Sequence, residues 1–322
     1  MRKMKRLNEF ITEDIKTMVI AGHVNPDGDC VGTTTALYGY VKDNFPWIDV
    51  SLYLERPKEE LMFLPGLTED VFTEPVRRSV DLFVSCDVST RDRIAAAGEL
   101  FDLAKRTLCI DHHASNPNFA DENFVDGDAG SCAEVLFTLF DEEKITRDIA
   151  ISLYTGMIHD TGVFQYSNVR PSTLRIAAAL IEKGVPFSEI IDKSFNERSL
   201  VQNRVLGYVL SKEQVFADGR IAAGCISLEE MKEYGAEKKD LDAIVANLRL
   251  TSGALAAAFV YETEPGTCKV SLRSSSDIDV SKTAALFGGG GHVKAAGCTV
   301  TGSPEEVLRT VTDALQKGMS GR

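Results

Sequence analysis

The chain has 322 residues, of which 44% are hydrophobic and 26% charged, and its formal net charge at pH 7 is −13. This acidic balance argues against a protein that binds long nucleic acid through a basic stripe, but it leaves room for a small anionic substrate. No stretch approaches the ~18 consecutive apolar residues of a membrane span, and polar residues follow the basic start Met1–Arg6, so we expect a cytoplasmic protein. The seven cysteines contain no CxxC pair, and we expect them to be reduced and structural.

The first part of the chain alternates apolar strands with helical periodicity. The predicted strands are Met18–His23, Val50–Leu54, Leu82–Asp87 and Thr107–Asp111. The predicted helices are Gly32–Val41, Asp92–Ala104, Ser131–Phe140, Ile149–Met157 and Ser172–Lys183. Such alternation predicts an α/β domain with a mostly parallel sheet and helices on both faces, which we assign to residues 1–192.

A polar helical linker is predicted over residues 193–211, and a different series of strands and helices follows it. The remaining elements are strands near Gln214–Phe216, Ile221–Ser227, Gly253–Glu262 and Cys268–Ser274, and helices near Glu229–Tyr234, Leu241–Asn247 and Pro304–Lys317. They predict a second, smaller α/β domain over residues 212–322, with the active site in the cleft between the two domains.

Histidines and aspartates gather directly after the predicted strands. The motif His23-Val24-Asn25-Pro26-Asp27-Gly28-Asp29 follows the first strand, Asp87 ends the third, and Asp111-His112-His113 ends the fourth. Because ligands bind beyond the carboxyl ends of parallel strands, we expect these side chains to converge into a divalent metal site. Structural alternatives exist: Asn-Pro-Asp-Gly is a common turn, and Asp87 could cap the following helix.

Asp160 adds a carboxylate at the end of a predicted helix. An acid at this end opposes the helix dipole unless a cation lies nearby.

Together these motifs resemble the four ordered motifs of the DHH phosphoesterase family. The run Gly288–Gly297, with the sequence GGGGHVKAAG, resembles the family's companion substrate-binding domain, DHHA1. The resemblance covers nearly the whole chain, and the layout is similar to the branch of nanoRNases and 3′-phosphoadenosine-5′-phosphate phosphatases.

The resemblance implies two divalent ions, Mn²⁺ in preference to Mg²⁺ or Co²⁺. The first ion would be held by His23, Asp27 and Asp87, and the second by Asp29, Asp87, His112 and Asp160. Asp111 would orient His112 or brace the strand, and His113 would face the phosphate as a catalytic residue. The family pattern uses Asp160 but not the neighbouring His159, which is therefore assigned to packing. Two ions ~4 Å apart would lower the pKa of a shared water, which attacks phosphorus in line.

Substrate binding is expected from both parts of the chain. A Gly-rich loop that enters a helix can bind phosphate through its N–H groups, which suggests Gly289, Gly290 and Gly291, with His292 beside them. The alternative is that the glycines form a flexible or tightly packed turn. Arg273 is a candidate for a bidentate phosphate contact, and its alternative is a surface charge on a strand edge. Arg91 and Asn116 are further candidates in the first domain.

The leading hypothesis is a hydrolase that acts on short oligoribonucleotides, on 3′-phosphoadenosine-5′-phosphate, or on both. Expected partners are short single-stranded RNA or DNA, with no membrane and no long duplex, and a homodimer is one candidate assembly. Alternatives are a phosphodiesterase of cyclic or linear dinucleotides, an inorganic pyrophosphatase, and a nucleotide-binding regulator without activity. The pyrophosphatase ranks lower because its tetra-anionic substrate needs a dense cluster of Arg and Lys.

Overall fold

A computed structural model describes residues 7–94, 97–275 and 278–320, which form two compact units, Met1–Glu197 and Arg198–Arg322. The first unit contains a sheet of five parallel strands in the order β2-β1-β3-β4-β5. These strands are β1 (Thr17–Ala21), β2 (Asp49–Tyr53), β3 (Leu82–Cys86), β4 (Thr107–Asp111) and β5 (Glu122–Val125). The central strands β3 and β4 are buried along their whole length, as expected where helices cover both faces of a parallel sheet.

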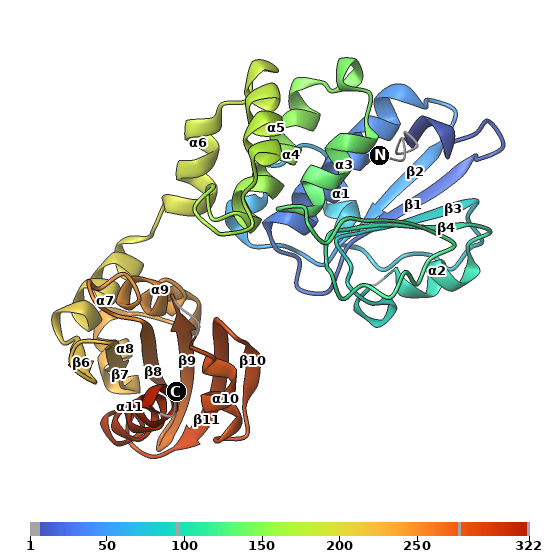
Figure 1. Ribbon diagram of the computed structural model, residues 1–322. Helices are drawn as coiled ribbons and strands as arrows, with labels where there is room; N and C mark the ends of the chain where they lie inside the picture. Colours follow the sequence, from blue (N-terminus) through green and yellow to red (C-terminus); the bar gives the residue numbers. More distant parts are fainter. Residues whose placement is uncertain (1–6, 95–96, 276–277, 321–322) are drawn as a thin grey trace. The chain divides into compact units, whose positions relative to one another are not determined.

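Helices cover the two faces of this sheet unequally (Figure 1). They are α1 (Gly28–Asn44), α2 (Gly98–Leu103), α3 (Cys132–Leu139), α4 (Arg147–Asp160), α5 (Pro171–Glu182) and α6 (Phe187–Ile191). One face packs its apolar side chains against α1, α3 and α4 in the main core, whereas the other face packs against α2 in a smaller core. The predicted α/β class, with a parallel sheet covered on both faces, is confirmed.

Helices α1 and α4 cross with almost no side chain between them. A Cβ atom built on Gly32 of α1 would lie 2.5 Å from the carbonyl oxygen of Ser152, and one built on Gly156 of α4 would lie 2.7 Å from Oδ1 of Asp29. Both positions therefore require glycine, and the two backbones lie in direct contact.

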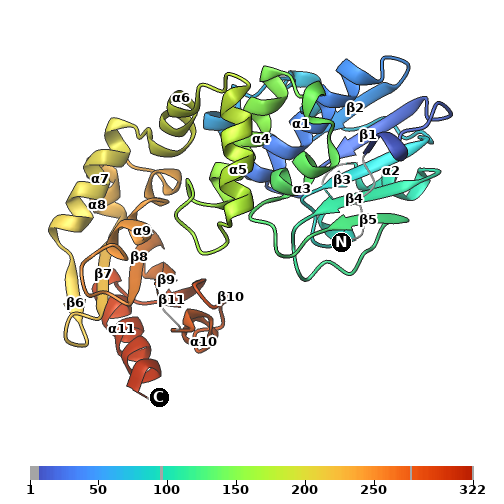
Figure 2. The same ribbon diagram turned by 45° about the horizontal axis from the view of Figure 1, so that its top comes forward.

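The second unit contains a mixed sheet in the order β10-β11-β9-β8-β7-β6 (Figure 2). Its strands are β6 (Gln214–Phe216), β7 (Ile221–Ile226), β8 (Ala256–Glu264), β9 (Thr267–Ser274), β10 (Gly290–His292) and β11 (Ala295–Thr301). Its helices are α7 (Leu200–Ser211), α8 (Leu228–Tyr234), α9 (Ile244–Leu248), α10 (Val280–Ala285) and α11 (Pro304–Ser320). Helices α7, α8 and α9 pack against one face of the sheet, and α10 and α11 pack against the other.

Several elements differ from the sequence predictions. The single helix expected over 92–104 is wrong: the chain forms a 3₁₀ turn at Arg91–Arg93 and the short helix α2, and residues 95–96 lie outside the described residues. The expected linker is divided, because the π-helical turn Asp192–Asn196 belongs to the first unit while α7 buries Val205 and Val209 in a core of the second. Among the described residues, the helices are too short or too polar to span a bilayer. The cytoplasmic location stays a prediction.

Candidate functional site

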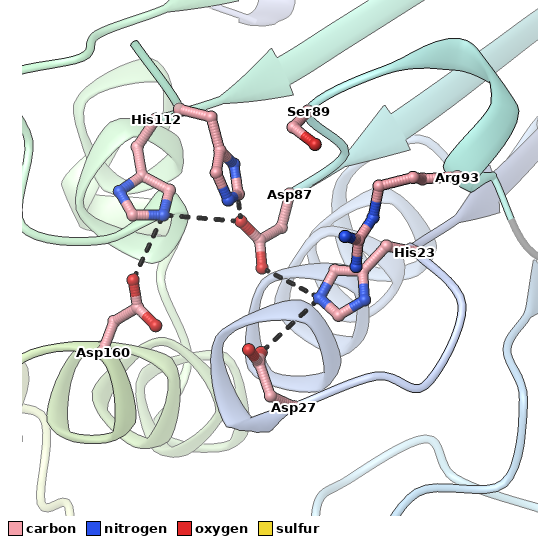
Figure 3. Close-up of a pocket in the computed structure, with 8 residues that line it drawn as sticks. His23, Asp27, Asp87, Ser89, Arg93, His112 and Asp160 are labelled. Carbon is pink, nitrogen blue, oxygen red and sulfur yellow. Dashed lines mark ion pairs between the residues drawn. The ribbon is translucent and has the colours of Figure 1, made fainter. Parts of the chain in front are cut away.

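A polar pocket of about 100 Å³ lies at the carboxyl ends of β1, β3 and β4 (Figure 3). It is lined by His23, Asp27, Asp87, Ser89, Arg93, His112, His113 and Asp160. The strand ends and helix ends deliver these side chains: His23 follows β1, Asp87 follows β3, the two histidines follow β4, and Asp160 ends α4. The sequence therefore predicted the convergence of its strand-end motifs correctly.

Asp87 occupies the centre of the pocket. Its Oδ2 lies 3.5 Å from His23 Nε2, and its Oδ1 lies 3.5 Å from His112 Nε2 and 3.7 Å from His113 Nδ1 (Figure 3). The backbone of Asp87 has a φ of 58°, a left-handed conformation that aspartate adopts more readily than most residues. One oxygen of this carboxylate faces His23 and the other faces His112 and His113, which is the arrangement of a bridging ligand.

The remaining acids group around His112 and His23. His112 Nε2 lies 3.1 Å from Asp160 Oδ2 and 3.9 Å from Asp29 Oδ2, and His23 Nε2 lies 3.7 Å from Asp27 Oδ1. A cation bound beside Asp160 and His112 would offset the unfavourable placement of an acid at this end of a helix.

Asp27 and Asp29 also close helix ends. Asp27 is the N-cap of α1, where its Oδ1 accepts hydrogen bonds from the N–H groups of Asp29 and Cys30. Asp29 is fully buried and accepts hydrogen bonds from the N–H groups of Cys132 and Ala133, at the start of α3. These bonds fix both carboxylates before any ion binds.

The partner of Asp111 differs from the expectation. Its Oδ1 lies 2.7 Å from Nδ1 of His113, whereas Nδ1 of His112 lies 3.4 Å from the carbonyl oxygen of Ala129. Asn116, expected to bind substrate, donates from Nδ2 to Asp111 Oδ2 at 2.6 Å and accepts with Oδ1 from the N–H of Asn118. Asp111 thus orients His113, and Asn116 braces Asp111 without lining the pocket.

Burial and neighbouring charges shift the pKa values of the acids and imidazoles at this site. Burial, together with the nearby carboxylates, raises the pKa of Asp29, and burial raises the pKa of Asp87. Burial opposes the charged form of His112, but its hydrogen bond to Asp160 and the surrounding acids outweigh this and raise its pKa to about 10. Burial also opposes the charged form of His23, but the carboxylates of Asp27 and Asp87 outweigh burial and raise its pKa. The pocket therefore attracts positive charge.

This donor set suits divalent ions. Oδ1 of Asp87 is buried and makes no hydrogen bond within the described part of the chain, an arrangement that is unfavourable for a carboxylate oxygen unless a cation is bound. Candidate ligand atoms fall into three overlapping groups: His23, Cys30 and Asp87; Asp87, His112 and His113; and Asp29, His112 and Asp160. Mixed imidazole and carboxylate ligands suit Mn²⁺ and similar ions.

Three residues at the site were not predicted from the sequence: Cys30, Ser89 and Arg93. Cys30 carried no signal beyond its position after Asp29, and Ser89 none beyond its position after Asp87. Arg93 replaces Arg91 as the arginine of the pocket: Arg91 Nη2 instead donates at 2.7 Å to Asp102 and at 2.7 Å to the carbonyl oxygen of Gly98.

His159 packs as expected. Its ring lies over Gly28, where a built Cβ would come within 2.1 Å of the ring, and meets Phe195 edge to face at 5.9 Å between centroids. Burial lowers the pKa of His159.

The glycine run of the second unit does not enter a helix, so the expected phosphate loop at a helix N-terminus is wrong. The N–H groups of Gly288 and Gly289 close the end of α10 by donating to Ala285 and Ala284, and the chain then forms β10. Close strand pairing explains two of the glycines: a Cβ on Gly289 would lie 2.2 Å from the oxygen of Gly297, and one on Gly291, which has a φ of 141°, would lie 2.5 Å from the oxygen of Ala295.

Arg273 and His292 nevertheless share one face of the sheet. Arg273 pairs with Ala295, which pairs with His292, and directly paired residues of antiparallel strands project to the same side. The next row on this face is Ser271, Gly297 and Gly290, which adds almost no side chain. This is the face that α7, α8 and α9 cover farther along the sheet. His292 is exposed and Arg273 half-buried.

Known proteins match both units. Residues 17–157 match the model of the DHH family, N-terminal domain, and residues 219–320 match the DHHA1 domain. The chain is 30% identical to the bifunctional oligoribonuclease and PAP phosphatase NrnA of Thermus thermophilus over 98% of this chain and 95% of that protein.

Two solved structures have a related fold. An exopolyphosphatase-related protein from Bacteroides fragilis aligns with a TM-score of 0.82 and 26% identity over 95% of this chain and 93% of that one. RecJ of Thermus thermophilus, solved in complex with Mn²⁺, aligns with a TM-score of 0.52 and 14% identity over 98% of this chain and 54% of RecJ, which shows a shared fold alone. The chain therefore belongs to the DHH family, with a DHH N-terminal domain followed by a DHHA1 domain.

Proposed function

We propose that this protein is a two-metal phosphoesterase that hydrolyses short oligoribonucleotides and 3′-phosphoadenosine-5′-phosphate. The central placement of Asp87, with one oxygen toward His23 and the other toward His112, is the observation that carries the proposal. The name of the Thermus thermophilus relative supports the choice of substrates.

The candidate ligands would divide between two ions. His23, Asp27 and Asp87 would hold one, and Asp29, Asp87, His112 and Asp160 the other, with Mn²⁺ as the preferred ion. When bound, two divalent ions supply Lewis acidity at the phosphoryl group and lower the pKa of an attacking water.

His113 is the proton donor in this proposal. Its hydrogen bond to Asp111 raises its pKa and fixes Nδ1 on that carboxylate, which leaves Nε2 to donate to a phosphoryl or leaving oxygen. Arg93 would bind a non-bridging phosphate oxygen, because its guanidinium lines an otherwise acidic pocket.

The face that carries Arg273 and His292 is proposed to bind the rest of the substrate. Two neighbouring strand spacings separate these residues by about 10 Å, with glycines in the adjoining row. Arg273 would contact a phosphate, and a base could stack on His292 over the open surface of Gly290 and Gly297.

A side-by-side turnover assay with Mn²⁺ tests the proposal. The substrates are 3′-phosphoadenosine-5′-phosphate, RNA of two to five and of about twenty nucleotides, linear and cyclic di-AMP, and pyrophosphate. We expect the nucleotide and the short RNAs to be hydrolysed at least about tenfold faster than the long RNA. A preference for cyclic di-AMP or pyrophosphate would assign the site to one of the alternatives, and no turnover with any of them would refute the enzyme.

A further inference from the structure

Residues 129–133, which lead into α3, contact two of the ligands proposed for the second ion. The carbonyl oxygen of Ala129 lies 3.4 Å from Nδ1 of His112, so that Nε2 is the atom presented to the pocket. The N–H groups of Cys132 and Ala133 donate to the two oxygens of Asp29 at 2.6 and 3.0 Å. This segment therefore fixes His112 and Asp29 relative to each other.

The amide side chain of Asn168 connects a third ligand of this ion, Asp160, to the same segment. Nδ2 of Asn168 donates to the carbonyl oxygen of Gly130 at 2.9 Å and to that of Asp160 at 3.1 Å. Asp160 is the last residue of α4, where a main-chain oxygen has no partner within the helix. Asn168 thus joins the end of α4 to the segment that leads into α3, and it does not line the pocket.

The backbone of Gly130, to which Asn168 is bonded, is also held by Glu134. Oε2 of the buried Glu134 accepts from the N–H of Gly130 at 3.1 Å and from the hydroxyl of Thr173 at 2.7 Å, and its Oε1 accepts from Ser172 at 3.0 Å. Both polar groups of the Gly130 backbone are therefore engaged, and this anchor has little freedom to move toward α4 or away from it.

An unusual turn brings Asn168 to this position. Gly162, Val163 and Phe164 have φ values of 56°, 53° and 62°, three consecutive left-handed residues. A β-branched residue such as valine rarely adopts this conformation, which persists only where the surroundings enforce it. The N–H of Val163 donates to Ile158 at 2.7 Å, and that of Tyr166 to Thr161 at 3.0 Å, so the turn is closed by the end of α4 itself.

We propose that Asn168 is a positioning residue that sets the affinity of the second ion site and leaves the first unchanged. The inference rests on the proposed two-metal function. Asn168 acts through Asp160, because it fixes the end of α4 relative to the segment that holds Asp29 and His112. The ligands of the first site come from the β1 loop and from Asp87, which Asn168 does not contact.

The test is a Mn²⁺ titration of the full chain, in which free Mn²⁺ is measured by electron paramagnetic resonance. We expect the wild type to bind two ions and to show the signal of a spin-coupled pair. In Asn168→Ala one ion should bind as before and the other about 10- to 100-fold more weakly, the loss typical when a supporting contact of a metal ligand is removed. Asn168→Asp, which keeps the shape but places oxygen against two carbonyl oxygens, should weaken the same ion at least as much.

Asn123→Ala is the matched control. Asn123, like Asn168, makes two side-chain hydrogen bonds to the main chain, but both are with Ala120, so they join no separate segments. Asn123 does not line the pocket, and both ions should keep their affinity in this variant. The positioning role is overturned if both affinities stay unchanged in Asn168→Ala and Asn168→Asp, or if both fall together, or if Asn123→Ala has the same effect. Fewer than two ions in the wild type would instead overturn the two-metal function itself.

Discussion

Asp81 and Asp87 stand at the opposite ends of β3, in opposite surroundings. At the amino end, Asp81 accepts hydrogen bonds from the N–H groups of Lys16 and Thr17 at 2.9 and 3.0 Å, and Lys105 Nζ lies 2.8 Å away. The ion-paired hydrogen bond with Lys105 and these N–H groups lower the pKa of Asp81. At the carboxyl end, burial raises the pKa of Asp87, and one of its oxygens makes no hydrogen bond within the described residues.

This contrast separates two uses of the same residue type. The folded state favours the charged form of Asp81, so its charge contributes to stability, whereas the charge of Asp87 opposes folding until a cation compensates it. A carboxylate that the fold leaves uncompensated at a strand end is the sign of a functional site.

The largest effect is expected from Asp87→Asn. The substitution keeps the shape of the side chain but removes the charge shared by both proposed ion sites, so kcat/KM with Mn²⁺ should fall by about 10³-fold or more. Steady-state hydrolysis of a dinucleotide is the measurement, and Asp92→Asn, an exposed acid in the 3₁₀ turn nearby, is the control. Turnover near the wild-type level would show that Asp87 is not a shared ligand.

Arg93→Ala and Arg91→Ala form a matched pair with the next largest effect. Loss of a charged hydrogen bond to phosphate should raise KM about 10- to 100-fold in Arg93→Ala. Arg91→Ala should leave KM unchanged and lower the melting temperature instead, since Arg91 is paired with Asp102. Equal changes in KM would remove the distinction between the two arginines.

The pocket was more predictable from sequence than its supports. Strand-end motifs have a fixed geometric meaning in a parallel sheet, so the convergence of His23, Asp87 and His112 followed from alternation alone. The partner of Asp111 did not follow, because the relative directions of His112 and His113 depend on the turn beyond β4. Arg91 was misassigned for a similar reason: its partner Asp102 lies eleven residues away, on a helix that the sequence joined to the turn.

The glycine run shows the same limit in the second unit. A run of glycines permits many backbone conformations, and only the pairing of β10 with β11 distinguishes a strand from a phosphate loop. The short strand β5, whose residues are all at least partly exposed, also lacked the apolar signal of its neighbours.

Asp81→Asn should have a moderate effect on stability and none on turnover. Loss of the charged contacts should lower the free energy of unfolding by about 1–2 kcal/mol at pH 7. Because the folded-state pKa of Asp81 is lowered, this contribution is present above the unfolded-state value near 3.8 and is lost as pH falls through the folded-state pKa. Urea unfolding of both proteins should show a difference at pH 7 that shrinks toward pH 3; a difference independent of pH would contradict the assignment.

The smallest expected effect concerns Asp87 in the absence of metal. Its pKa is raised by burial, so above the unfolded-state pKa its charge destabilises the fold, and Asp87→Asn should unfold at a temperature a few degrees higher with a chelator present, equivalent to about 1 kcal/mol. Added Mn²⁺ should reverse the order, because only the wild type gains stability from ion binding. Thermal unfolding of both proteins with chelator and with Mn²⁺ measures these two effects. If the metal-free variant is less stable than the metal-free wild type, the charge of Asp87 stabilises the fold, as that of Asp81 does.

The glycine contact between α1 and α4 has a consequence for how the enzyme can change. Asp29 lies in the first turn of α1 and Asp160 ends α4, and where the helices cross at Gly32 and Gly156 their separation is the thickness of two main chains. No conservative replacement of Gly32 or Gly156 can change the distance between the helices in small steps, since even one methyl group forces the helices apart. Directed evolution toward new substrates should therefore accumulate its useful mutations on β9, β10 and β11, while the α1–α4 crossing tolerates almost none.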